Sequence, residues 1–420
     1  MPRVAAIIVN LVPYHHVRWD ACAAGGVAET HLVELTDRDE FKVLEFSRKS
    51  RFARHTLFPK ATCGDGTVAG GDLLSRTMQE VLDVIRPDVV CVSGWGLSVS
   101  LVAMKWAAAR SVPIVMLSES NEFDEARSPI KEFIKRRLVG LCSAGLAGGS
   151  PQADYLVKLG LPRERVFKGY DVVDNGFFAE KSEELGARSL ELGKEKGPFF
   201  FACARFGKKK NLPGLIRAYS RYRKLTEPST LDPRPSTAAA VATSAFSLQP
   251  SAFDLVIAGE GEERAEIERT IQEHGLSEHV HLVGAKGYTE LPSCYAHAGA
   301  FIHASTTEQW GLVVNEAMAS GLPVLVSNRC GCAADLVKEE ENGWTFDPTD
   351  EEQLAALMVR IASDETKRKA MGAKSREIIA EWGPERFATG VKAAVEAALT
   401  APRKKAGLLD RLILWVMTRR

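Results

Sequence analysis

Two glutamates bracket the predicted start of a short helix in the C-terminal third of the chain. Glu308 lies in a polar turn and Glu316 lies inside the helix, with seven residues between them. The apolar run over residues 312–320 predicts this helix. Gly321 and Pro323 predict its end, because glycine suits a C-terminal cap and proline cannot continue a helix. The two carboxylates could therefore bind hydroxyl groups on either side of the helix start.

The start of this helix is suited to a phosphate group. Free backbone N–H groups and the positive end of the helix dipole lie near Gly311 and Leu312, and Gly311 lets a ligand approach the backbone closely. One turn further, the Glu316 carboxylate could accept hydrogen bonds from a ribose, as the acidic residue of a dinucleotide site does. The alternative is that Glu308 and Glu316 are ordinary solvated residues. The apolar neighbours of Glu316 argue against it, since a buried carboxylate needs a partner.

A second group of charged residues follows a predicted strand earlier in the chain. Residues 199–203 form this apolar strand, which leads into a cation-rich turn with Arg205 and Lys210 five positions apart. At the carboxyl end of a strand these side chains could converge on a diphosphate, arginine as a two-pronged donor and lysine as a point charge. A basic turn exposed to solvent is the alternative.

At these residues the chain resembles a known family of enzymes. The run from Glu308 to Val324 reads Glu-Gln-Trp-Gly-Leu-Val-Val-Asn-Glu-Ala-Met-Ala-Ser-Gly-Leu-Pro-Val and is similar to the Glu-x7-Glu signature of family 4 retaining glycosyltransferases. Further family-like pieces follow the family's order: Ala204-Arg205 with Lys210-Asn211, Ala-Gly-Glu-Gly-Glu at 258–262, Leu-Val-Gly at 282–284 and Asn-Gly-Trp-Thr-Phe-Asp at 342–347. The resemblance implies the GT-B fold, an α/β architecture of two Rossmann-like doubly wound domains that face a central cleft.

The resemblance also implies roles for these residues. Arg205 and Lys210 would stabilise the leaving diphosphate, and Glu308 would contact the hydroxyls of the donor sugar. The donor-binding candidates are Glu316, which would contact the ribose, and Gly311, Leu312, Trp310, Gly259 and Gly284. The family is generally thought to act by front-face departure and attack, in which the diphosphate itself can take the proton of the acceptor. No metal and no cofactor are implied, since the nucleotide-diphosphate sugar is a substrate.

The N-terminal half resembles the family only in its rhythm of strands and helices. Continuous apolar strands separated by helices predict a parallel sheet covered on both faces, with ligands at the carboxyl ends of the strands. Segments 10–19, 93–96 and 118–122 follow such strands and are polar or rich in glycine. The glycine-glycine loop and the histidine that family members often carry here are not recognisable. The acceptor-side candidates are His15, His16, Trp95 and Glu119.

The pattern along the chain predicts the domain organisation. The predicted parts are an acceptor-side Rossmann-like domain over 1–178, a polar linker over 179–197, a nucleotide-sugar-binding domain over 198–375 with a flexible insertion at 227–251, a closing helix over 376–400 that reaches back to the N-terminal domain, and a basic amphipathic tail over 401–420.

The composition is that of a globular protein of two or three domains. The chain has 420 residues, of which 45% are hydrophobic and 26% charged, and its formal net charge of zero argues against nucleic acid as a main partner. Eight scattered cysteines favour reduced, mostly buried thiols over a disulfide framework. No apolar run is long enough to span a bilayer, and the apolar start predicts a buried strand rather than a signal peptide. We therefore expect a cytoplasmic protein.

Three basic segments could contact an anionic membrane from the cytoplasmic side. Segments 47–55 and 128–138 mix cations with apolar residues, and either a solvated face or a patch for anionic lipid or a charged acceptor would explain them. In the tail, residues 403–405 are basic and precede apolar residues at helical spacing from Leu408 to Val416. Such a helix suits a membrane interface, and packing on its own protein is the alternative.

The sequence thus predicts a retaining, metal-independent glycosyltransferase. We expect it to move a hexosyl-type sugar from a nucleotide-diphosphate sugar to a hydroxyl of a glycan or a lipid-linked acceptor, in the synthesis of a cell-surface polysaccharide, lipopolysaccharide or glycolipid. A catalytically inactive GT-B-like protein that binds partners at the membrane is the alternative from another class. Another GT-B enzyme, such as a sugar-nucleotide epimerase, is the third hypothesis.

Overall fold

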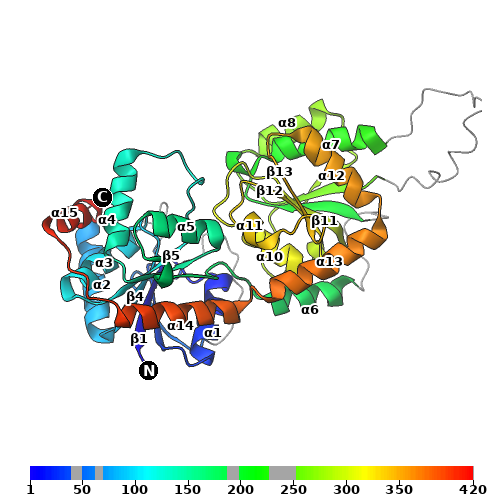
Figure 1. The fold of residues 1–420 in the computed structure, drawn as a ribbon. Helices are drawn as coiled ribbons and strands as arrows, with labels where there is room; N and C mark the ends of the chain where they lie inside the picture. The colour runs from blue at the N-terminus through cyan, green and yellow to red at the C-terminus, as the bar shows by residue number, and fades with distance from the viewer. Residues whose placement is uncertain (39–49, 62–69, 187–197, 227–251, 420) are drawn as a thin grey trace, which may run out of the picture. The chain divides into compact units, whose positions relative to one another are not determined.

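The computed structural model describes residues 1–38, 50–61, 70–186, 198–226 and 252–419. The chain forms two compact units, coloured in sequence order in Figure 1. Unit 1 contains residues 1–174, 309–312 and 381–420, and unit 2 contains residues 175–308 and 313–380. The chain therefore passes between the units more than once.

Unit 1 is built on a sheet of seven parallel strands in the order β3-β2-β1-β4-β5-β6-β7. The strands are β1 (Arg3–Ile8), β2 (Glu29–Glu34), β3 (Ala53–Thr56), β4 (Val89–Ser93), β5 (Ile114–Ser118), β6 (Ala144–Ala147) and β7 (Val166–Lys168). The central strands β1, β4, β5 and β6 are apolar and almost wholly buried, as expected for a parallel sheet that is covered on both faces.

Two layers of helices cover this sheet. One core contains side chains of α2 (Gly71–Ile85), α3 (Ser98–Arg110), α4 (Pro129–Gly140), α5 (Ser150–Lys158) and the last helix, α15 (Leu408–Met417). The other core is formed with α1 (Pro13–Ala24) and α14 (Pro384–Thr400), which pack against each other in Figure 1. A short 3-10 turn, η1 (Arg163–Arg165), precedes β7.

Unit 2 repeats the plan with six parallel strands in the order β10-β9-β8-β11-β12-β13. The strands are β8 (Phe199–Cys203), β9 (Asp254–Ala258), β10 (Val280–Leu282), β11 (Ala298–His303), β12 (Val324–Ser327) and β13 (Gly343–Phe346). The helices are η2 (Lys208–Lys210), α6 (Asn175–Gly186), α7 (Leu212–Thr226), α8 (Arg264–Glu273), α9 (Leu291–His297), α10 (Leu312–Ala319), α11 (Ala333–Leu336), α12 (Glu351–Ala362) and α13 (Glu365–Ala380). These two sheets confirm the predicted α/β class with two Rossmann-like domains.

Strand order decides where each unit can hold a ligand. In unit 1 the order reverses between β1 and β4, and in unit 2 it reverses between β8 and β11. Loops that leave neighbouring strands at such a switch point run in opposite directions and open a crevice at the carboxyl edge of the sheet. The residues predicted to do chemistry follow β1, β4, β5, β8 and β11.

The structure corrects several predicted boundaries. Residues 179–186, predicted as linker, belong to α6, whereas 187–197 and the predicted insertion 227–251 lie outside the described residues. The predicted closing helix over 376–400 is two elements, because α13 ends at Ala380 and α14 begins at Pro384. Gly383 precedes that proline, which occupies the first helical position. Residues 381–420 group with unit 1.

Two further expectations concern the cysteines, predicted as reduced and mostly buried thiols, and the membrane, for which no spanning segment was predicted. Cys22, Cys91, Cys142, Cys294, Cys330 and Cys332 are free and buried, and Cys203 is free and half-buried. Among the described helices, none has both the length and the apolar character that a membrane span requires.

Candidate functional site

The loops after β8 and β11 form the predicted donor-side site of unit 2. β8 and β11 are hydrogen-bonded neighbours, so the turn that carries Lys210 and the turn that carries Glu308 leave the sheet side by side. The Thr306 N–H donates to the Lys209 carbonyl oxygen at 2.8 Å and joins the two loops. The sheet thus brings together residues that are 98 positions apart in the chain.

Lys210 and Glu308 form an ion pair at this edge. The Lys210 Nζ contacts Glu308 Oε2, and the two side chains are only 16% and 12% exposed. His303, the last residue of β11, lies with its Nε2 3.5 Å from the same carboxylate oxygen. The Ser305 hydroxyl lies 3.4 Å from Glu308 Oε2 and 3.3 Å from His303 Nε2. The carboxylate is therefore held from three sides, with little freedom to turn away.

The surroundings of Glu308 keep it ionised. Burial alone would raise the pKa of its carboxyl, but the hydrogen bond of His303 and the charge of Lys210 hold that pKa well below its usual range. Burial lowers the pKa of His303, so the imidazole stays neutral near pH 7. An ionised carboxylate offers only acceptors, which suits the hydroxyl groups of a sugar.

Arg205 stands at the same edge of the sheet. It follows β8 by two residues and its side chain is exposed. Asn211 ends the turn in the left-handed conformation with φ 54°. The Asn211 amide donates to the Pro348 carbonyl oxygen at 2.8 Å and anchors the start of α7. The turn therefore presents its cations from a fixed backbone.

The glycines after β9 allow their loop to lie directly on the β8 loop. Gly259 has φ 145°, and a Cβ there would lie 1.9 Å from the Ala204 carbonyl oxygen. A Cβ at Gly261 would lie 2.6 Å from the Phe206 carbonyl oxygen. The Gly259 N–H donates to the Gly284 carbonyl oxygen at 2.9 Å. Close backbone packing by itself explains glycine at 259 and 261.

Glu316 is fully buried on α10. The Tyr295 hydroxyl donates to Glu316 Oε2 at 2.7 Å. The Tyr295 ring packs edge-on against Phe178 and Phe201, which fixes the direction of the hydroxyl. Burial and then the Glu316 charge raise the pKa of Cys203, so the carboxylate lies near the end of β8. The expected partner of this buried carboxylate is thus a tyrosine 21 positions away.

Residues 309–312 group with unit 1 rather than with the glutamates on either side. Gly311 has φ 106°, and the predicted C-cap Gly321 has φ 84°. Trp310, predicted as a donor-binding residue, is only 2% exposed and packs on Trp382 with the ring centres 5.3 Å apart. A Cβ at Gly148 would lie 3.2 Å from the Trp310 ring. Trp310 therefore anchors this segment in unit 1, a role that its place in the sequence does not indicate.

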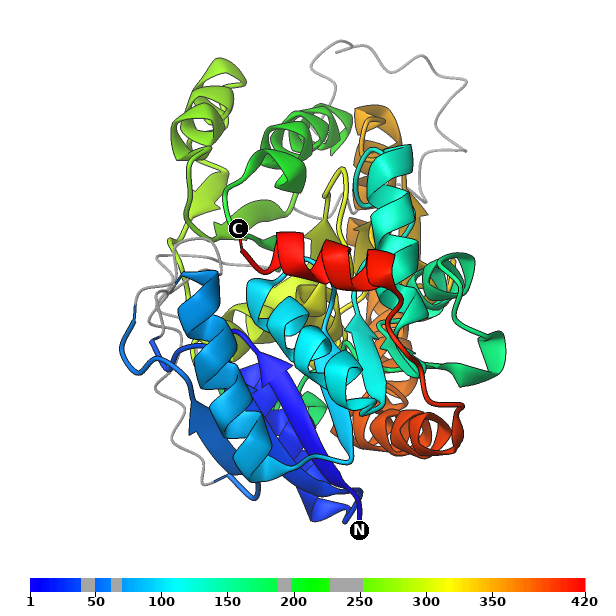
Figure 2. The ribbon, with the colours of Figure 1, turned by 90° about the vertical axis from the view of Figure 1, so that its left-hand side faces the viewer.

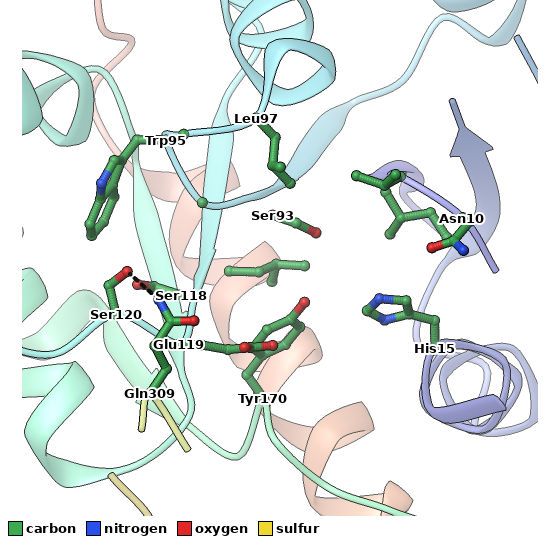
Figure 3. A pocket seen from close by; sticks show the side chains of 15 residues that line it. Asn10, His15, Ser93, Trp95, Leu97, Ser118, Glu119, Ser120, Tyr170 and Gln309 are labelled. Carbon is green, nitrogen blue, oxygen red and sulfur yellow. Dashed lines mark hydrogen bonds between the residues drawn. The ribbon is translucent and has the colours of Figure 1, made fainter. Parts of the chain in front are cut away.

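Unit 1 has a pocket at the carboxyl ends of β1, β4 and β5 (Figure 3). Its volume is about 360 Å³, within the range of small-molecule sites. The lining residues are Ile8, Val9, Asn10, His15, Ser93, Gly94, Trp95, Gly96, Leu97, Leu117, Ser118, Glu119, Ser120, Tyr170 and Gln309. The pocket lies at the switch point between β1 and β4, where a ligand is expected.

Three of the four acceptor-side candidates line this pocket. His15, Trp95 and Glu119 face it, whereas His16 is buried and packs against Phe52 with the ring centres 5.6 Å apart. The Nδ1 atom of His15 is buried and has no hydrogen-bond partner among the described residues. Burial, with a smaller effect of the Arg18 charge, lowers the pKa of His15 to about 3. The pocket therefore offers a neutral imidazole with an open polar atom.

A buried ion pair, Arg18 with Asp171, lies next to the pocket residue Tyr170. Arg18 Nη2 lies 3.4 Å from Asp171 Oδ1, Arg18 Nε donates to the Val172 carbonyl oxygen at 3.1 Å, and the guanidinium lies 4.9 Å from the centre of the Tyr170 ring. Burial and then the Glu119 charge raise the pKa of Asp171. These residues were not predicted as site residues. Arg18 between Val17 and Trp19 on α1 was the available signal, since a charged residue on a buried helix face needs a partner.

Gln309 is a further pocket residue that the sequence did not indicate. Its side-chain Nε2 donates to the Ser120 hydroxyl at 3.3 Å, the bond drawn in Figure 3. The Asn121 amide donates to the Gln309 carbonyl oxygen at 3.4 Å. Only tertiary structure brings Gln309 to Ser120, because 189 positions separate them.

Among the described residues, no group of three or more His, Cys, Asp and Glu side chains is placed so that it could hold a metal ion.

In sequence, this chain matches known proteins over the part that forms most of unit 2. Residues 188–378 match the family model of glycosyl transferases group 1. Sulfoquinovosyl transferase SQD2 from Arabidopsis thaliana is 38% identical over 91 residues, which are 21% of this chain and 18% of that relative. A GDP-mannose-dependent alpha-(1-6)-phosphatidylinositol monomannoside mannosyltransferase from Mycobacterium tuberculosis is 30% identical over 136 residues. That segment is 30% of this chain and 35% of the relative, so the chain matches no more than about a third of either protein.

Solved structures with the same fold cover nearly the whole chain. HepE from Anabaena in complex with UDP has a TM-score of 0.69 at 17% identity and covers 93% of this chain and 98% of its own. Sucrose-phosphate synthase from Thermosynechococcus elongatus has a TM-score of 0.68 at 17% identity and covers 93% and 97%. These likenesses show the GT-B fold that the resemblance implied.

Proposed function

We propose that this chain is a retaining glycosyltransferase of family 4 that uses a nucleotide-diphosphate sugar. The observation that carries the proposal is the Lys210–Glu308 pair at the carboxyl ends of the adjacent strands β8 and β11. A cation and an ionised acid at a switch point suit a substrate with an anionic part and a polyol part. The family match over 188–378 supports the same assignment.

The cations stabilise the leaving group. As the glycosidic bond breaks, negative charge grows on the diphosphate and positive charge grows on the sugar ring. Lys210 and Arg205 lie where they can offset the negative charge, and the positive end of the α10 dipole contributes to the same stabilisation. The diphosphate takes the proton of the acceptor in the front-face reaction that we propose, so no side chain has to act as a covalent nucleophile.

The two acids bind polyols. Glu308, held ionised by Lys210 and His303, accepts hydrogen bonds from the hydroxyls of a hexosyl-type sugar. Glu316 accepts a hydrogen bond from Tyr295 and keeps acceptor capacity for a ribose. We propose UDP as the first nucleotide to test, because the similarly folded HepE was crystallised with UDP. The reaction as proposed requires no metal ion and no cofactor.

The unit 1 pocket is proposed as the acceptor site. His15, Glu119 and Trp95 give it one neutral imidazole, one carboxyl and one aromatic ring, a combination suited to a sugar. A glycan or a lipid-linked saccharide is the acceptor that we propose, in the synthesis of a cell-surface polysaccharide, lipopolysaccharide or glycolipid. The relative that acts on a phosphatidylinositol mannoside supports a lipid-linked acceptor among the compounds to be tested.

The test is a donor and acceptor screen with single variants. Lys210→Ala and Arg205→Ala should each lower the turnover of a UDP-, GDP- or ADP-hexose about 100-fold, because each removes a charge that stabilises the leaving group. Lys224→Ala, an exposed change in the last turn of α7, is the control and should keep full turnover.

Full turnover of Arg205→Ala and Lys210→Ala would refute the proposed site. Tight nucleotide-sugar binding without hydrolysis or transfer would instead favour the inactive binding protein. Retention is checked by the anomeric configuration of the product in the NMR spectrum.

A further inference from the structure

The outer face of α15 is apolar although it faces solvent. Leu414 is only 1% exposed and faces the core of unit 1, beside the partly buried Ile413 and Met417. The opposite face carries Leu408, Leu409, Leu412, Trp415 and Val416, all between 41% and 88% exposed. A surface helix normally turns polar side chains outward, so a helix that is apolar on both faces needs a second apolar contact.

Two neighbouring helices contact α15. The Arg137 guanidinium on α4 is 2.7 Å from Asp410 Oδ1 on α15, so these helices lie side by side. A Cβ at Gly71, the first residue of α2, would lie 1.9 Å from the Thr418 carbonyl oxygen, so the end of α15 rests on the start of α2. Figure 2 shows α15, in red, lying across the helices of unit 1.

These helices carry most of the exposed large apolar side chains of the described residues. We define the α15 patch as Leu73, Ile130, Phe133, Leu408, Leu409, Leu412, Trp415 and Val416. It holds eight of the twelve such side chains in the part of the chain that the structure describes. Single exposed apolar residues need no explanation, but eight of them on three contacting helices indicate an interaction surface.

The charges around the α15 patch are mostly positive. Arg403, Lys404 and Lys405 are exposed just before α15, and Arg411 and Arg419 are exposed on and after it. On α4, Arg136 is exposed, whereas the exposed Lys131 lies 3.6 Å from the exposed Glu125. The acidic groups of α15 and α4 are engaged, since Asp410 pairs with Arg137 and Glu132 pairs with Lys135 and Arg127. Asp72, next to Leu73, is the exposed acid at the patch margin.

We infer that the α15 patch docks on an anionic lipid surface. An apolar stripe with flanking cations matches a bilayer interface, where apolar side chains enter the boundary of the acyl chains and cations meet the lipid headgroups. The cations before and after α15 favour an anionic surface over a neutral one. The inference concerns adsorption to the surface only and does not depend on the transferase assignment.

The segment between β5 and α4 links the patch to the unit 1 pocket. Glu119 and Ser120 line the pocket, and the segment is fastened to α4 by Arg127 and Lys135, the latter 2.7 Å from Glu125. Ile130 and Phe133 lie in the first turns of α4. If the pocket holds a lipid-linked acceptor, which rests on the proposed function, this segment connects the acceptor site to the docking surface.

The test is vesicle flotation with the full chain. Wild type should float with vesicles that contain phosphatidylglycerol, should float far less with phosphatidylcholine alone, and should be released by raised salt. Leu412→Gln should weaken binding about ten-fold, whereas the matched Leu225→Gln should leave it unchanged. Leu412 is 54% exposed on α15 and Leu225 is 62% exposed in unit 2, so neither change disturbs a core.

A charge variant tests the electrostatic part independently. Lys405→Glu should weaken binding about five-fold or more, and Lys392→Glu, an exposed change on α14 on the opposite face of the sheet, should not. Equal binding by Leu412→Gln and Leu225→Gln, or no binding of wild type to anionic vesicles, would overturn the inference. So would sedimentation velocity showing a wild-type dimer that Leu412→Gln dissociates, with no vesicle binding, since a second copy would then cover the patch.

Discussion

At the residue scale, the buried His15 should make the unfolding free energy of unit 1 depend on pH. Its pKa of about 3 in the folded chain lies below the usual value near 6.5, so the unfolded chain binds more protons between these values. Stability should therefore fall as pH drops below about 6.5, by up to about 1.4 kcal/mol per pH unit from this residue. We expect His15→Asn to flatten the pH dependence of the urea unfolding free energy of unit 1 between about pH 5 and 7. The exposed His274→Asn is the control, and equal slopes for wild type and His15→Asn would contradict the account.

At the element scale, the contact between the β8 and β9 loops depends on one backbone shape. Gly259→Ala places a Cβ 1.9 Å from the Ala204 carbonyl oxygen at φ 145°, so the loops must separate. We expect a loss of about 2 kcal/mol or more in unfolding free energy, together with weaker binding of a nucleoside diphosphate. Gly207→Ala, in the β8 loop but with open space around its Cβ, should be near neutral. Urea unfolding and calorimetric titration measure both, and equal stability of the two variants would refute this packing role.

At the scale of the whole molecule, each unit has its own buried core. The cores over β1–β7 and over β8–β13 share no residue, and the charged residues of the proposed donor site, Lys210, Glu308 and Glu316, lie in unit 2. Calorimetry should therefore show two transitions, and UDP at about 100 times its Kd should raise one of them by several degrees. Met358→Ala, in the unit 2 core, should lower that same transition and so identify it. A nucleotide shift in the transition that Met358→Ala leaves unchanged would place the donor site in unit 1.

Local sequence was sufficient for the elements and for singling out the charged residues that β8 and β11 bring together. Continuous apolar strands such as β4 and β8 predicted parallel sheets, and the helix from Leu312 with its glycine cap formed as expected. Arg205, Lys210 and Glu308 could be singled out because each follows a recognisable strand by a few residues. The boundary at α6 was wrong because a polar composition does not distinguish an exposed helix from a linker.

The sequence by itself therefore determined the features that depend on a few neighbouring residues. These are the strands, the helices, the helix cap and the residue types at the ends of strands. Backbone sterics and the periodicity of buried residues act over a few residues, so these features can be predicted without knowledge of the tertiary structure. Tertiary structure decided the pairings across long separations, namely Lys210 with Glu308, Arg18 with Asp171 over 153 positions and Arg137 with Asp410 over 273. Strand order brings such residues together, and that order minimises the free energy of the whole sheet rather than of any one segment.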